Sequence, residues 1–129
     1  MPESLPDSVM NRIRRLPDQV WIGMLLLWTA ALLQGTLSPI TALTDPPFAQ
    51  ADKVLHFAGW FGLAWLASAL ADSVAARLVV WFACTVFGFL VEIGQIPIPL
   101  RSFEELDLLA DTAGAAMGVV LALDRPDPK

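Results

Sequence analysis

The sequence predicts an all-α protein, an integral membrane bundle of four transmembrane helices with both termini in the cytoplasm. Three observations support this fold class: the composition, long runs without charge, and the positions of the prolines. The chain has 129 residues, of which 56% are hydrophobic and only 16% are charged. Soluble domains average about 45–50% apolar and about 25% charged residues, so the composition favours a single membrane domain.

Four apolar segments carry the expected helices. A membrane-spanning helix needs roughly 20 apolar residues, and residues 19–44 contain no charge. The expected helices cover about residues 19–37, 52–71, 74–96 and 104–123. The charge-free part of the fourth, residues 112–123, has only 12 residues, a length that also suits a core or interfacial helix. All ten prolines lie outside these segments or at their ends, where they interrupt a helix least.

A soluble four-helix bundle is the main alternative fold. Each helix of such a bundle would need a polar face to meet water. The runs VWIGMLLLWTAALL and LVVWFACTVFGFLV have no polar face. These two runs therefore argue for lipid rather than water around the expected helices.

The ends of the chain are expected to lie outside the membrane. Residues 1–18 would form a cytoplasmic N-terminal segment and residues 124–129 a cytoplasmic tail, flanking a membrane domain of residues 19–123. A cleaved signal peptide is not expected, because the first apolar run is too long and continues into a proline-containing loop. The single cysteine, Cys84, cannot form an internal disulfide, and the net charge of −5 argues against nucleic acid as a partner.

Lysine and arginine are distributed unevenly between the two sides of the expected bundle. These residues favour the cytoplasmic side of a membrane. One side would hold Arg12, Arg14, Arg15, Arg77, Arg125 and Lys129. The other side would hold only Lys53 and Arg101. This split predicts a multi-pass protein whose loops 38–51 and 97–104 face outward.

Most of the unusual polar residues fall at the outer ends of three expected helices. The expected binding residues are Lys53, His56, Glu92, Gln95, Arg101, Ser102, Asp107 and Asp111, and the catalytic candidates are His56, Glu92 and Asp52. Three pairs share a helical face because their members lie three or four residues apart: Asp52 with His56, Glu92 with Gln95, and Asp107 with Asp111. A carboxylate near the bilayer centre costs about 2.5–3.5 kcal/mol, so these side chains are expected to pair inside the bundle.

Arg101 is the expected partner of the acidic side chains. Its guanidinium stays charged and can bind a carboxylate through two hydrogen bonds. We therefore expect it to fold back onto Glu92, Asp107 or Asp111. Purely structural roles are the alternatives for other residues: Asp52 as a helix cap, His56 as a hydrogen-bonded core residue, Gln95 as an interhelical donor, and Glu104 and Glu105 as solvated residues at a helix N-terminus.

Small residues recur at every fourth position of the fourth expected helix, at Ala110, Gly114 and Gly118. This pattern lets two helices approach closely. It predicts close packing within the bundle first and dimerisation second, so a homo-oligomer is one of the expected partners.

Two segments resemble the VanZ-like family: DKVLHFAGWFGLAWL, and VEIGQIPIPLRSFEELDLLADTAGAAMG. The shared elements are Asp52, Lys53, His56, Glu92, Gln95, Arg101, Ser102, Asp107, Gly114 and Gly118, whereas family members often carry Asn in place of Asp111. The resemblance covers about residues 20–123. It implies a small multi-spanning protein of the bacterial cytoplasmic (inner) membrane. The family is named for a member linked to resistance to the glycopeptide teicoplanin, which implies a role at the cell envelope.

Two classes of function remain open. In the first, the site binds or modulates a cell-envelope component: a lipid headgroup, a cell-wall precursor or a glycopeptide-related target. Lys53 and Arg101 would then contact an anionic group. In the second, a membrane-embedded enzyme acts on a lipid-linked substrate in hydrolase- or transferase-like chemistry. His56 would serve as general acid or base, Asp52 or Glu92 would orient it, and Arg101 would stabilise negative charge.

No cofactor and no metal are expected. His56, Glu92, Asp107 and Asp111 could supply nitrogen and oxygen ligands, but the sequence has neither an HExxH motif nor paired cysteines. The expected partners are membrane lipids and a cell-wall precursor or envelope protein. Accessibility separates the two functions, because an enzyme should leave one face of His56 open beside a cavity.

Overall fold

The computed structural model describes residues 5–39 and 50–124. This part of the chain is all-helical, without strands, as the sequence predicted. Its elements are α1 (Leu5–Arg14), α2 (Asp18–Leu37), α3 (Ala51–Ser68), α4 (Val74–Gln95) and α5 (Glu105–Val120). Most of the expected outward loop 38–51, together with Arg125 and Lys129, lies outside the described residues.

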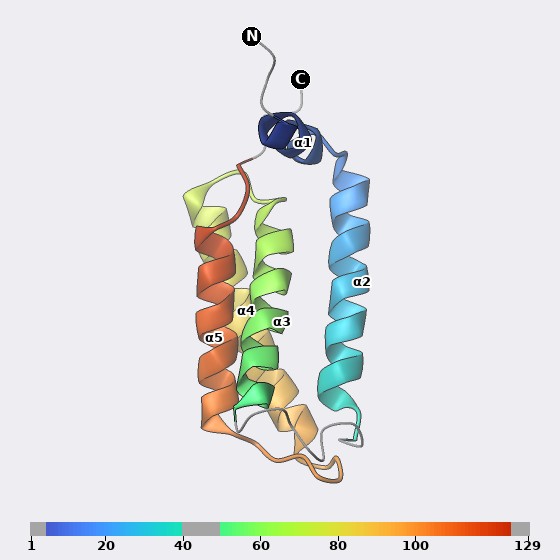
Figure 1. The fold of residues 1–129 in the computed structure, drawn as a ribbon. Coiled ribbons are helices and arrows are strands. Elements are labelled where there is room, and N and C mark those ends of the chain that lie inside the picture. Colours follow the sequence, from blue (N-terminus) through green and yellow to red (C-terminus); the bar gives the residue numbers. More distant parts are fainter. Residues whose placement is uncertain (1–4, 40–49, 125–129) are drawn as a thin grey trace.

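Helices α2 to α5 stand side by side as an elongated bundle, and consecutive helices run in opposite directions (Figure 1). α1 lies across one end of the bundle, where α2 begins and α5 ends. The opposite end, where α2 and α4 end and α3 and α5 begin, is called the site end below. α3 contacts each of the other three bundle helices, so residues in its first turns meet side chains from all sides.

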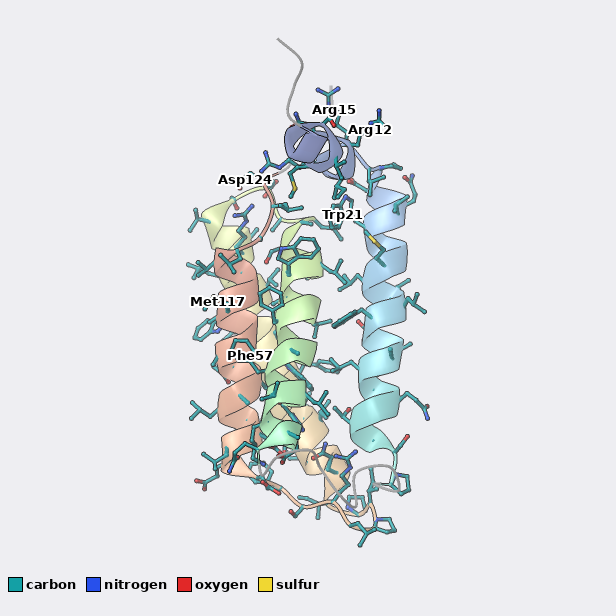
Figure 2. All side chains as sticks on the ribbon, viewed as in Figure 1. Arg12, Arg15, Trp21, Phe57, Met117 and Asp124 are labelled. Carbon is teal, nitrogen blue, oxygen red and sulfur yellow. The ribbon has the colours of Figure 1, made fainter. Side chains whose placement is uncertain are left out.

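The short helix α1 was not among the expected helices. Its Ile13, and Leu16 just after it, pack with Trp21 and Leu66 in a small apolar cluster. Figure 2 shows Arg12 on α1 and Arg15 just after it, at the outer face of this end. The spacing of Val9, Ile13 and Leu16, four and three residues apart, is a helical signal that the polar composition of the segment concealed.

Two of the five helices, α2 and α4, are long and apolar enough to cross a membrane by length and composition. The sequence predicted four such helices. α3 has 18 residues but carries Asp52, Lys53 and His56 near its start, and it ends at Ser68 rather than near residue 71. α5 has only 16 residues, Glu105–Val120, rather than 104–123. Both helices therefore lack the length of uninterrupted apolar sequence that α2 and α4 have.

The described part of the bundle is apolar outside and polar at several places inside. Large apolar side chains are exposed on all four bundle helices, among them Leu26, Leu27, Val54, Leu55, Val79, Phe82, Leu106 and Leu109. The buried polar or charged side chains are Thr36, His56, Ser68, Glu92, Gln95, Asp107 and Asp111. Soluble proteins rarely bury Asp or Glu so completely. Six of the seven lie at the site end, and Ser68 lies at the opposite end.

α3 and α5 pack so closely that a side chain larger than that of glycine would not fit at positions 114 and 118. A Cβ atom on Gly114 would lie 2.2 Å from the backbone oxygen of Phe57, and one on Gly118 would lie 2.4 Å from that of Phe61. Both glycines are buried, and Figure 2 marks Phe57 at this contact. The small-residue pattern thus serves packing within the bundle, as predicted. The contact fixes the position of His56 along the bundle axis relative to Asp107 and Asp111.

Candidate functional site

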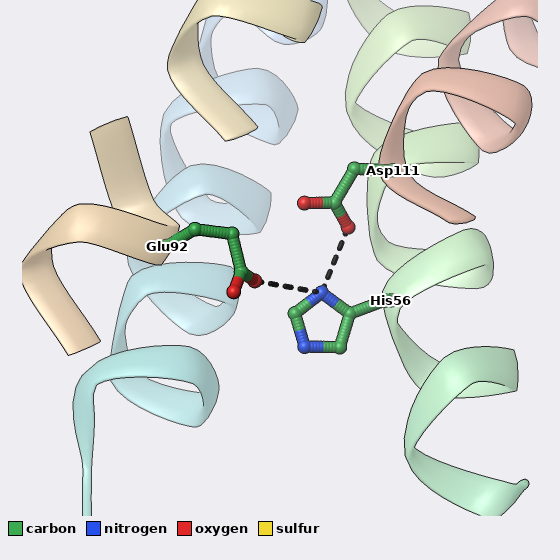
Figure 3. A group of neighbouring side chains, drawn as sticks. All are labelled: His56, Glu92 and Asp111. Carbon is green, nitrogen blue, oxygen red and sulfur yellow. Dashed lines mark hydrogen bonds and ion pairs between the residues drawn. The ribbon is translucent and has the colours of Figure 1, made fainter. Parts of the chain in front are cut away.

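Three helices each contribute one side chain to a buried group at the site end. His56 comes from α3, Glu92 from the last turn of α4, and Asp111 from the second turn of α5. Figure 3 shows the three side chains pointing toward one another. The Nδ1 atom of His56 lies 2.8 Å from Oδ1 of Asp111 and 3.8 Å from Oε1 of Glu92. These three residues are called the inner group below.

The imidazole ring of His56 is held on every side. Its Nε2 atom lies 3.6 Å from Oδ2 of Asp107, so both ring nitrogens face carboxylates. The ring stacks on the indole of Trp60, with centroids 5.8 Å apart and an interplanar angle of 14°. His56 is only 5% exposed. The ring is therefore fixed in position and is closed to a substrate in this conformation.

Lys53 joins a second set of carboxylates nearer the end of the bundle. Its ammonium lies 2.6 Å from Oδ2 of Asp52 and 2.5 Å from Oδ1 of Asp107, and it also pairs with Glu104. The Asp52 and Glu104 side chains are 43% and 47% exposed. Lys53, Asp52 and Glu104 are called the outer group below. Asp107 connects the two groups, because it contacts both Lys53 and His56.

The inner group contains carboxylate oxygens that have no hydrogen-bond partner among the described residues. Oε2 of Glu92 accepts a hydrogen bond of 3.2 Å from the backbone N–H of Glu104. Oε1 of Glu92 and Oδ2 of Asp111 are buried without such a partner. Both residues are 0% exposed. Buried polar atoms are normally satisfied, so these two oxygens call for an explanation.

Gly88 lies against the Asp111 carboxylate, and its lack of a side chain leaves room for that carboxylate. A Cβ atom at this position would lie 2.9 Å from Oδ2 of Asp111 and 3.0 Å from Nε1 of Trp60. That Nε1 is already engaged, since it donates to the backbone oxygen of Cys84 at 3.0 Å. Neither Gly88 nor Trp60 was predicted to be a site residue. The signal was present, because each lies four residues from a selected side chain, Glu92 and His56 respectively.

Negative charge exceeds positive charge in the described part of the site. The carboxylates are those of Asp52, Glu92, Glu104, Asp107 and Asp111. Only Lys53 and, when protonated, His56 oppose them. Carboxylates that share a small volume repel one another unless protons or cations intervene. The arrangement therefore suits a positively charged ligand better than an anionic one.

The expected pairing of Arg101 with Glu92, Asp107 or Asp111 is wrong. Its Nη2 donates to the backbone oxygen of Gly35 at 2.8 Å, and its Nε donates to that of Ser38 at 3.2 Å. The last carbonyls of a helix have no partner within the helix and carry negative partial charge. Arg101 therefore caps the end of α2 and is not available to the carboxylates.

The connection between α4 and α5 directs Arg101 to α2. The backbone N–H of Arg101 donates to the carbonyl of Ile98 at 3.1 Å, and Leu100 has a positive φ of 64°. Pro99 at the second position and a positive φ at the third are features of a type II turn. Leucine seldom adopts this conformation. The turn was therefore not predictable from residue preferences.

Four further residues that were considered for the site lie outside the inner group. Gln95 is buried and donates to the backbone oxygen of Thr36 at 3.0 Å, which is the interhelical role weighed as its alternative. Asp52 pairs with Lys53 and makes no hydrogen bond or ion pair with His56 in the described part of the chain; it does not cap α3, whose N-cap residue is Gln50. Ser102 is exposed in the α4–α5 connection. Glu104 is exposed as expected, but it also binds Lys53.

A comparison with protein families shows to which family the chain belongs. The family model of VanZ/LLP1 matches residues 8–123, nearly the whole chain. The chain belongs to the VanZ/LLP1 family. The match extends the resemblance seen in the sequence to α1 and covers every residue of the inner and outer groups. Searches of curated proteins and of solved structures give no match for this VanZ/LLP1 member.

Proposed function

We propose that α2 to α5 all cross the bacterial cytoplasmic membrane, with the site end outside and both termini inside. The exposed apolar side chains on all four helices support this arrangement. At about 1.5 Å per residue, the 18 residues of α3 reach about 27 Å, close to the hydrocarbon thickness of about 30 Å. The polar residues of α3 and α5 face the bundle interior, where the membrane tolerates them.

The charges at the two ends support the same orientation. Arg12 on α1 and Arg15 just after it lie at one end, and Arg77 pairs with Asp124 there at 2.7 Å. Lys53 and Arg101 lie at the site end, where each is bound by protein acceptors. Arginine and lysine concentrate on the cytoplasmic side, which makes the α1 end the inner one.

Reporter fusions test this topology. A phosphatase that is active only outside the cytoplasm should be silent when fused after Lys129 and active when inserted into the exposed α4–α5 connection at Ser102. A fluorescent protein that matures only in the cytoplasm should give the reverse pattern. Phosphatase activity at Lys129, with matched expression of both fusions, would refute the orientation.

We propose further that the protein binds a cell-envelope component through a positively charged amine of that component. One observation carries the proposal: the carboxylates of the site outnumber its cationic side chains. Asp52 and Glu104 are half exposed, so an amine arriving from outside meets them first. Each can accept further hydrogen bonds from an ammonium group, and such bonds are strong because both partners are charged.

The earlier expectation of an anionic ligand has lost its support. It depended on Lys53 and Arg101 being available. Lys53 is shared among three carboxylates, and Arg101 is bound to two carbonyls of α2. A positively charged amine complements the excess negative charge of the site carboxylates. Two envelope sources carry one: the ethanolamine headgroup of a membrane lipid, and the free amino group of a cell-wall precursor peptide.

Thermal stability of the purified protein in detergent tests the amine. Phosphatidylethanolamine should raise the melting temperature by several degrees, while phosphatidylcholine, which has no N–H donor, and anionic phosphatidylglycerol should not. A precursor peptide with a free amine, compared with its N-acetylated form, tests the second source. The combined substitution Asp52→Asn and Glu104→Gln should remove the shift.

Glu105→Gln is the matched control. Glu105 is exposed in the first turn of α5, beside Glu104, and it makes no ion pair with Lys53 among the described residues. This variant should keep the full shift. Equal stabilisation by phosphatidylglycerol and phosphatidylethanolamine, or no shift with either amine, would refute the proposal.

A membrane-embedded enzyme is the second candidate function. The hydrogen bond of 2.8 Å between His56 and Asp111 favours it, because a carboxylate that orients a histidine is a common part of acid–base catalysis. The burial of the ring argues against it. In this conformation both nitrogens of His56 face carboxylates, and a substrate would have to displace one of them.

A further inference from the structure

We propose that the inner group, His56, Glu92 and Asp111, binds a divalent metal ion. The proposal goes beyond amine binding, which concerns the exposed carboxylates of the outer group. Each inner residue offers one ligand atom, and these three atoms all lie within 4.8 Å of one another. All three side chains are buried, and they come from three different helices, so an ion there would join α3, α4 and α5.

The two distances from His56 suit coordination of one ion. Nitrogen and oxygen ligands bind first-row metals at about 2.0–2.2 Å, so two ligands of the same ion lie no more than about 4.4 Å apart. The Nδ1 atom of His56 lies 2.8 Å from Asp111 and 3.8 Å from Glu92. The hydrogen between Nδ1 and the Asp111 oxygen would be replaced by the metal.

The unpartnered oxygens are an independent observation that points to a cation. Oε1 of Glu92 is buried, has no hydrogen-bond partner among the described residues, and is directed at His56 (Figure 3). Oδ2 of Asp111, the oxygen that does not contact His56, is also buried without a hydrogen-bond partner among the described residues. A buried carboxylate oxygen without a partner is destabilising. One ion would bind Oε1 of Glu92 and would offset the negative charges of Glu92 and Asp111 together.

Neighbouring groups already orient the ligands. Asp107 faces the second nitrogen of His56 at 3.6 Å, and the backbone N–H of Glu104 binds the other oxygen of Glu92 at 3.2 Å. Metal-binding histidines usually direct their second nitrogen at a carboxylate, and metal-binding carboxylates are usually hydrogen-bonded. Both features fix the donor atoms before an ion arrives.

The outer group provides a natural contrast. Asp52, Glu104 and Asp107 also lie close enough together to bind a cation, but the ammonium of Lys53 already binds all three. No lysine or arginine pairs with the two carboxylates of the inner group among the described residues. One imidazole nitrogen with two carboxylates, and no thiolate, fits Zn²⁺ or Mn²⁺. Three protein ligands also leave coordination positions open for water or another ligand.

Titration of the purified full-length protein tests the site. The protein is prepared in detergent without a histidine tag, freed of metal with a chelator, and titrated with Zn²⁺ by calorimetry. One equivalent is expected to bind and to raise the melting temperature. Glu92→Gln and Asp111→Asn should each weaken binding at least tenfold. Glu105→Gln, which changes a carboxylate outside both groups, should leave it unchanged.

Pulsed electron paramagnetic resonance of bound Mn²⁺ keeps the test decisive if the variants fail to fold, because it uses the parent protein. His56 is the only histidine in the chain, so coupling to an imidazole nitrogen would identify it as a ligand. Three results would each overturn the proposal: no saturable metal binding, no coupling to an imidazole nitrogen, or a loss of metal affinity in Glu105→Gln equal to that in Glu92→Gln and Asp111→Asn. Amine binding is measured on the metal-free protein, so the two proposals can fail separately.

Discussion

Gly114→Ala is expected to prevent most of the protein from reaching its folded state. The new Cβ atom would lie 2.2 Å from the backbone oxygen of Phe57, and a backbone atom in a packed helix has little room to move. Overpacking commonly costs about 1–3 kcal/mol, and sometimes more; the direct backbone clash places this substitution at about 3 kcal/mol or above. The measurement is the amount of folded protein in the membrane and its melting temperature in detergent.

Gly23→Ala is the matched control, because it adds the same methyl group to a helical glycine. No atom lies within 4 Å of a Cβ atom at Gly23. Alanine favours a helix over glycine by about 0.5–1 kcal/mol, so this variant should be as stable as the parent or slightly more stable. Equal stability of Gly114→Ala and Gly23→Ala would show that α3 and α5 are not in close backbone contact.

Lys53→Met is expected to cause the second large loss of stability. The substitution leaves the buried carboxylate of Asp107 without its cation and removes the shared partner of Asp52 and Glu104. Removing one member of a buried ion pair typically costs about 3–5 kcal/mol. Because Asp52 and Glu104 are half exposed and water screens them, the lower end of about 3 kcal/mol is expected from Asp107. Denaturant or detergent unfolding of the purified protein measures it.

The double variant Lys53→Met and Asp107→Asn separates charge from packing. It removes the buried negative charge together with its partner, so much of the lost stability should return, as a double-mutant cycle reports. Lys53→Arg keeps the charge and should cost less than Lys53→Met. If the double variant is as unstable as the sum of the two single variants, the ion pair is not the cause.

The sequence could predict much of the fold because hydropathy and proline positions mark where helices begin and end. The all-α class and the packing role of Gly114 and Gly118 followed from such local patterns, and the structure confirms both. α1 was missed because its apolar positions are few and its arginines made the segment look like a tail. The fourth-helix estimate was too long, since apolar sequence continues past Val120 without remaining helical.

The composition of the candidate site was partly visible in the sequence. His56, Glu92, Asp107 and Asp111 each lie a few residues from a helix end, so an antiparallel bundle brings them to one level. The structure places these four together. Their function in binding stays a prediction that the experiments above address.

The pairing of the remaining residues could not be read from the sequence, because it depends on how each helix is rotated and where its connection runs. Arg101 reaches α2 only because the chain turns at Pro99 and Leu100. Glu104 meets both Lys53 and Glu92 only because α5 begins beside them. Spacing along one helix carries no information about either contact.

The contact between α3 and α5 also sets an order of events during biosynthesis. His56 and Asp111 are 55 positions apart in the chain, and α4 is synthesised between them. Until α5 has joined the bundle, Lys53 lacks Asp107, and His56 lacks both Asp107 and Asp111. A chain that stops before α5 would lack both of these carboxylates, so the last bundle helix completes the charge pairing of Lys53 and His56.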